Sequence, residues 1–145
     1  MISIDTNVLL RYLLQDDKKQ AILTNRLINK NEIILITDIV LIETLWTLKG
    51  KKYNLDKEAL LAVIESIFKE PNLVFENGQL VWRALNTYRS TQLIKVGKKK
   101  KDADFADILI LEKSKYLCSK QDRLFQGFYS FDIAAQQIDG IEKPG

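Results

Sequence analysis

Short apolar runs alternate along this chain with segments whose apolar residues recur at helical spacing, and this alternation most constrains its fold. The apolar run at residues 33–36 is typical of a strand that is buried on both faces, as in a parallel sheet. Strands that alternate with helices form parallel sheets covered by helices. We therefore predict an α/β fold of three layers, in which a central parallel sheet is flanked by helices.

The elements follow from the same pattern. The predicted strands are 2–4, 33–36, 73–75 and a last central strand at 128–131. The predicted helices are 8–13, 21–27, 39–48, 55–68, 79–88 and 103–115. Thr37 or Asp38 is expected to cap the helix that Gly50 ends, and Asp102 to cap the last helix. No repeat or linker divides the 145 residues, so we expect a single domain, 1–145.

Two residue counts exclude several kinds of chemistry. The chain has no histidine and one cysteine, Cys118, so it can form neither a thiolate zinc cluster nor a histidine-assisted nucleophile. Catalysis must then use carboxylates, hydroxyls, lysines or metals bound by oxygen. No apolar stretch approaches the roughly 20 residues that cross a bilayer, and no basic segment precedes an apolar one at the start. We expect a cytoplasmic protein without a membrane partner.

Acidic residues recur where a parallel sheet holds its functional crevice, beyond the carboxyl ends of the strands. Asp5 ends the first predicted strand and Asp132 the last, while Glu43 and Asp107 lie within about two turns of helix starts. Asp5, Asp104 and Asp132 each have a structural alternative, because they can cap the segments that follow them. Glu43 lies among apolar residues, where a carboxylate must be exposed, paired or bound to a cation.

Asp104 and Asp107 are three residues apart and share one helical face, where two unpaired carboxylates repel each other unless a cation lies between them. Acids that converge without nearby histidine or cysteine match an oxygen-only site for Mg²⁺ or Mn²⁺. Such a site can hold two ions about 4 Å apart and hydrolyse a phosphodiester bond. The sequence thus indicates a metal-dependent nuclease.

Four segments resemble the motifs of the PIN-domain family and, within it, of VapC-type toxins from toxin-antitoxin pairs. They are IDTNVLLR at 4–11, VLIETLW at 40–46, ADFADILI at 103–110 and SFD at 130–132. The resemblance covers nearly the whole chain. It implies a PIN-like domain that cleaves RNA, forms a homodimer and is blocked by a cognate antitoxin protein.

The resemblance also implies roles for individual residues. The cation would be held by Asp5, Glu43, Asp107 and Asp132, with Asp104 as a further ligand or an outer acid. The residues that would orient this cluster are Thr6, Asn7 and Ser130.

Basic residues offer a path for RNA. The run Lys98, Lys99, Lys100 and Lys101 could carry RNA phosphates to the metal, or it could be a solvated flexible loop. A second cluster after the Glu43 helix, at 49–52, could extend the path. For the tryptophans and tyrosines, which lie at helical spacing among apolar residues, we expect core packing.

Two other functions stay open at this point. The residues after Asp132 are IAAQ, where many relatives have a basic residue, so the chain could be an inactive PIN-like RNA-binding or interaction module. An aspartyl-phosphate phosphatase or receiver domain would also use acids at strand ends. That alternative is disfavoured because Asn7 stands where such a phosphatase has its second aspartate, and no aspartate closes the third predicted strand.

Overall fold

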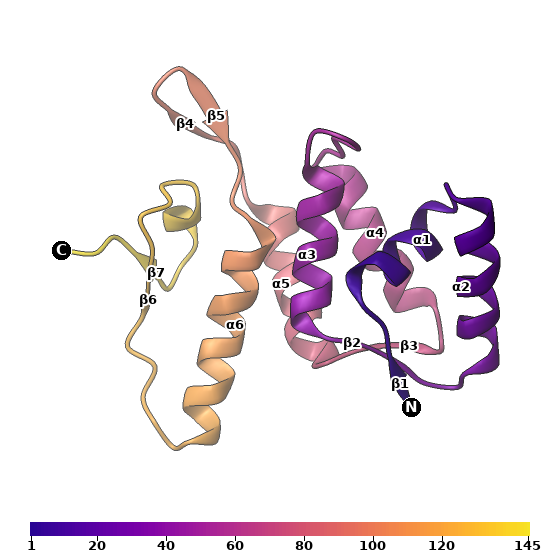
Figure 1. Cartoon of the computed structure of the whole chain (residues 1–145). Helices are drawn as coiled ribbons and strands as arrows, with labels where there is room; N and C mark the ends of the chain where they lie inside the picture. Colours follow the sequence, from indigo (N-terminus) through magenta and orange to yellow (C-terminus); the bar gives the residue numbers. More distant parts are fainter. The chain divides into compact units, whose positions relative to one another are not determined.

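A computed structural model describes residues 1–145 and confirms the predicted α/β class with its parallel sheet. The chain forms two compact units, Met1–Gly78 and Gln79–Gly145, and each is described by itself. Figure 1 shows the course of the chain, with unit 1 in indigo to magenta and unit 2 in pink to yellow. No helix combines the length and the apolar character that crossing a membrane requires.

Unit 1 contains the parallel sheet, whose strand order is β1-β2-β3. The strands are β1 (Ile2–Ser3), β2 (Ile34–Ile36) and β3 (Leu73–Phe75). Ile34 of the central strand pairs with Ile2 on one side and Leu73 on the other. Ile34 and Ile36 are fully buried, as the continuous apolar run predicts for a strand covered on both faces.

The helices of unit 1 connect these strands and cover them. They are α1 (Thr6–Leu14), α2 (Lys18–Lys30), α3 (Asp38–Lys49) and α4 (Lys57–Lys69). Each begins at a side-chain oxygen that accepts a backbone N–H bond, and the capping residues are Asp5, Asp17, Thr37 and Asp56. Gly50 ends α3 as predicted. Because α1 packs against both α2 and α3, the start of α1 is held close to α3.

Unit 2 is built on two longer helices and two small sheets. The helices are α5 (Gly78–Ser90), which begins with the last residue of unit 1, and α6 (Phe105–Lys120), with the short 3-10 helix η1 (Ala135–Gln137). One sheet is an antiparallel hairpin of β4 (Ile94–Val96) and β5 (Lys99–Lys101); the other is a parallel pair, β6 (Phe128–Tyr129) and β7 (Ile141–Glu142). Tyr88 of α5 packs edge-to-face on Phe105 of α6, with 5.7 Å between ring centroids.

Two expectations for unit 2 are wrong, and a third segment differs from one of its two alternatives. The predicted last central strand is a two-residue strand that pairs with β7 instead of joining the sheet of β1 to β3. The lysine run, for which RNA binding and a solvated loop both stayed open, is ordered in part, because Lys99–Lys101 form one exposed strand of a hairpin. Asp102 does not cap α6. Its carboxylate binds Thr91 Oγ1 and the N–H of Ala103, and the helix begins two residues later, at a cap formed by Asp104.

The prediction that the tryptophans and tyrosines pack in the core is wrong for the two tryptophans. Trp46 and Trp82 are 53% and 50% exposed, although they lie among apolar residues in α3 and α5. Tyr88 is buried as predicted. Helical spacing alone does not say which side of an apolar helix faces the core when both sides carry apolar residues.

Candidate active site

Asp5 follows β1 and caps α1. Its Oδ1 accepts a hydrogen bond from the N–H of Val8 at 2.9 Å. Its Oδ2 accepts no hydrogen bond, and the side chain is exposed. The cap therefore fixes the direction of the carboxylate and leaves one oxygen accessible.

Glu43 lies in the second turn of α3 and is tied to the start of α1. Thr6 Oγ1 donates a hydrogen bond to Glu43 Oε2 at 3.0 Å, while Oε1 of Glu43 accepts none. The prediction that this carboxylate must be exposed or paired is confirmed, because it is both exposed and hydrogen-bonded. The bond between Thr6 and Glu43 holds two helix starts together, and with them Asp5 and Glu43.

A cavity of about 240 Å³ adjoins this part of unit 1. It is lined by Asp5, Asn7, Val8, Arg11, Gln20, Leu23 and Thr24. The Arg11 guanidinium, the cation of this lining, forms an ion pair of 2.6 Å with Asp16. Asn7 lies next to Asp5 in the lining but forms no hydrogen bond to Asp5 or Glu43.

The acids at the start of α6 lie in unit 2. Asp104 caps the helix, because its Oδ1 accepts the N–H of Ala106 at 3.1 Å. Asp107 follows in the first turn and is half-buried. Burial raises the pKa of the Asp107 carboxyl, and the negative charges of Asp104 and Asp132 raise it further. These three carboxylates therefore share one electrostatic environment inside unit 2.

Asp132 lies just after β6 and is held by its own turn. Ser130 Oγ accepts the N–H of Asp132 at 3.0 Å, and Asp132 Oδ1 accepts the N–H of Ala135 at 3.2 Å, at the start of η1. Oδ2 of Asp132 accepts no hydrogen bond. Ser130 thus orients the backbone at Asp132 instead of bonding to its carboxylate.

The structure divides the predicted acids into two sets. Asp5 and Glu43 belong to unit 1, and the other three belong to unit 2: Asp104, Asp107 and Asp132. No group of three or more His, Cys, Asp or Glu side chains in residues 1–145 has the geometry of a metal site. The donor set itself consists only of carboxylate oxygens, which suits Mg²⁺ or Mn²⁺.

Two further acids of unit 1 lie just after strands of the parallel sheet, and neither was predicted to be a site residue. Asp38 follows β2, and Glu76 follows β3 and donates its N–H to the carbonyl of Ile36. The Glu76 carboxylate accepts the N–H of Asp38 at 2.9 Å, so it also stabilises the start of α3. The signal that could have found both is the one used for Asp5, an acid within two residues of the end of an apolar strand.

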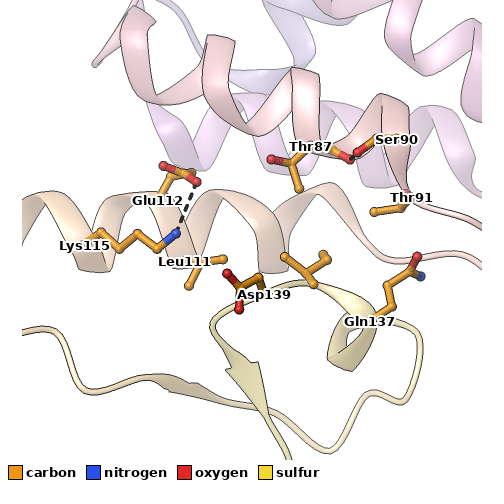
Figure 2. A pocket seen from close by; sticks show the side chains of 9 residues that line it. Thr87, Ser90, Thr91, Leu111, Glu112, Lys115, Gln137 and Asp139 are labelled. Carbon is orange, nitrogen blue, oxygen red and sulfur yellow. Dashed lines mark hydrogen bonds and ion pairs between the residues drawn. The ribbon is translucent and has the colours of Figure 1, made fainter.

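A second cavity, of about 320 Å³, lies within unit 2 at the end of α5 (Figure 2). Its labelled lining residues include Thr91, Gln137 and the pair Glu112 and Lys115, whose charged atoms are 3.8 Å apart. None of the five predicted site acids lines it. The candidate acids of unit 2, which are Asp104, Asp107 and Asp132, are therefore separate from this cavity.

Comparison with known proteins identifies a protein family and a similar solved structure. A family model described as the PIN domain matches residues 2–125. The chain is similar to the crystal structure of VapC20 from Mycobacterium tuberculosis, described as a toxin that cleaves the sarcin-ricin loop. The two chains share 14% identity over 94% of each, with a TM-score of 0.39. No curated protein matches the chain.

Proposed function

Because the chain belongs to the PIN-domain family, we propose that it is an endoribonuclease whose acids act together on a divalent cation. The residues that would hold Mg²⁺ or Mn²⁺ are Asp5, Glu43, Asp104, Asp107 and Asp132. The ion would supply an activated water and stabilise the oxygen that leaves when the phosphodiester bond is hydrolysed.

The observation that carries this proposal is how the carboxylates are bonded. Asp5, Glu43 and Asp132 each use one oxygen in a hydrogen bond that orients the side chain, and each keeps the other oxygen free of hydrogen bonds. Thr6 and Ser130 serve this orientation in the two units. Ligands held in this way lose little freedom when a cation binds.

The charges in unit 2 support the same conclusion. The pKa of Asp107 is raised by burial and by two neighbouring carboxylates, which makes its ionised form costly without a cation. A divalent ion between these acids would remove that cost. The acids of unit 2 therefore fit an ion that the family would use.

The order of the four motifs further supports a VapC-type toxin. We accordingly propose a cytoplasmic protein that acts as a homodimer and is blocked by a cognate antitoxin. The mass of the purified chain in solution tests the homodimer, and the mass of its complex with the antitoxin tests the second partner.

Cleavage of a mixed RNA pool tests the proposed activity directly. The purified chain should cut RNA with Mg²⁺ or Mn²⁺ but not with EDTA, and an Asp5→Asn and Asp107→Asn double variant should be inactive with either ion. Equal cutting by wild type and double variant would contradict the proposal.

An inactive RNA-binding module is the second candidate, and the sequence after Asp132 favours it. Residues 133–136 contain no basic side chain to help hold a substrate there. Such a module would bind RNA in a salt-sensitive way that is indifferent to divalent metal.

A further inference from the structure

The hairpin of β4 and β5 carries a concentrated positive charge. Five of the nine residues at 93–101 are lysines, none is acidic, and all five lysines are exposed. The rest of the chain has seventeen Lys and Arg against nineteen acids, a net charge of −2, whereas the whole chain has +3. The hairpin thus reverses the sign of the chain's charge.

The strand register places these lysines on both faces of the hairpin. Lys95 lies directly opposite Lys100, while Lys99 and Lys101 pair with Val96 and Ile94. Because alternate residues of a strand point to opposite faces, Lys95 and Lys100 share one face, and Lys99 and Lys101 share the other. None of the five lysines forms an ion pair. Like charges directly opposite each other destabilise a strand pair, so this hairpin favours a bound anion.

The turn gives the hairpin a defined shape. Gly97 and Lys98 form a two-residue loop between the paired residues Val96 and Lys99, and Gly97 has a φ of +64°. Glycine with positive φ at the first loop position, followed by a residue with negative φ, is the pattern of a type II′ turn. In Figure 1 the hairpin extends as an arm beyond the start of α6.

The base of the arm is fixed on both sides by side-chain bonds. Thr91 lies just before the arm and Asp102 just after it, and Thr91 Oγ1 donates a hydrogen bond to Asp102 Oδ1 at 3.2 Å. Gln137 binds the backbone of Gln92 twice, accepting its N–H and donating to its carbonyl, both at 2.9 Å. Thr91 and Gln137 both line the cavity shown in Figure 2.

These bonds connect the arm to the segments that carry the acids of unit 2. Asp102 lies two residues before Asp104, the cap of α6. Gln137 is the last residue of η1, and Asp132 accepts a hydrogen bond from Ala135 at the start of the same short helix. The arm is therefore held in a fixed relation to Asp104 and Asp132.

We propose that the β4–β5 hairpin is an arm that binds the phosphate backbone of RNA, with Lys95 and Lys100 as its central pair of cations. Lysines without arginine or aromatic neighbours supply charge for phosphates and offer no platform on which bases could stack. The fixed base would direct a bound strand toward the acids. This inference rests on the proposed function in taking RNA as the polyanion; an acidic protein segment is the alternative partner.

Binding of a polyuridine oligonucleotide about 20 residues long to the full chain in EDTA tests the arm. We compare Lys95→Gln/Lys100→Gln with a control of equal charge, Lys19→Gln/Lys30→Gln, on exposed sites of α2. Each lost phosphate contact lowers the salt slope by about 0.7, which is about fivefold in affinity at 0.1 M salt. The hairpin variant should therefore bind roughly 25-fold more weakly with a slope smaller by about 1.4, while the control stays near wild type.

Equal losses in the two variants, or none in the hairpin variant, would overturn the inference. Binding of polyglutamate as tight as that of polyuridine at the same salt would also overturn it, in favour of an acidic protein partner. Because binding is measured without metal, it is independent of cleavage. Metal-dependent cutting with unchanged binding refutes the arm alone, and hairpin-dependent binding without cutting refutes only the proposed nuclease.

Discussion

Substitution of Asp5 separates its two roles, the cap of α1 and the proposed metal ligand. Asparagine caps a helix about as well as aspartate, whereas alanine cannot accept the bond from Val8 N–H. Loss of this cap costs about 1 kcal/mol, which for a chain of this size lowers the Tm by about 3 °C. Asp5→Asn should therefore melt near wild type, and Asp5→Ala about 3 °C lower.

The effect on RNA cleavage should differ from the effect on stability, because the two variants should lose similar amounts of activity. Both variants lose the carboxylate charge, and removal of even an outer partner of a metal ligand costs roughly 10–100-fold. We expect RNA cleavage to fall at least about 100-fold in both, which is about 2.7 kcal/mol in the barrier. Cleavage rates with saturating Mg²⁺ and melting curves of the same preparations provide the measurement.

Asp17 supplies the matched control, since it caps α2 with a bond of 3.0 Å from the N–H of Gln20. Asp17→Asn and Asp17→Ala should repeat the two stability effects and leave cleavage unchanged. Full cleavage by Asp5→Asn would show that Asp5 is a cap only. A melting temperature of Asp5→Asn as low as that of Asp5→Ala would refute the account of the cap.

Two further predictions concern the neighbouring acids. The pKa of Asp107 is raised in the folded chain, so the proton on this group stabilises the fold; that contribution is fully present below the ordinary aspartate pKa and is lost as pH rises through the raised value. Asp107→Asn should thus raise the Tm of the metal-free chain at neutral pH and have less effect in acid, and a fall in Tm at neutral pH would contradict this. Thr6→Val removes the bond to Glu43 and should lower cleavage roughly 10–100-fold at a stability cost of about 1 kcal/mol or less, whereas Thr6→Ser should restore the rate. Unchanged cleavage by Thr6→Val would show that Thr6 does not orient the acid.

The sheet of unit 1 was predictable because its strands have a local signature. A strand buried on both faces must be apolar at every position, and the runs that form β2 and β3 are. The helix starts were predictable for a similar reason, since each needs an oxygen to accept a free N–H, as Thr37 does for α3.

The elements that sequence could not give depend on contacts between distant residues. In β5, three consecutive lysines have no strand pattern, and pairing with Ile94–Val96 alone makes them a strand. Three acids stand near the start of α6, and any could cap it; Asp102 is excluded because Thr91 binds it. The bond between Thr6 and Glu43 joins residues 37 positions apart. The motifs could therefore name Glu43 as a site residue, but they could not show which side chain orients it.

The sheet of unit 1 is complete within the first 75 residues, and this bears on the order in which a ribosome makes the chain. All three parallel strands, with Asp5 and Glu43, are translated before Asp104, Asp107 and Asp132. At 5–20 residues per second, roughly 3 to 11 seconds separate the end of unit 1 from the synthesis of Asp132. A nascent chain can therefore fold its first half while it still lacks three of the five proposed ligands. If the proposed activity is correct, the ribosome and its messenger are not exposed to the complete set of ligands before Asp132 has been synthesised.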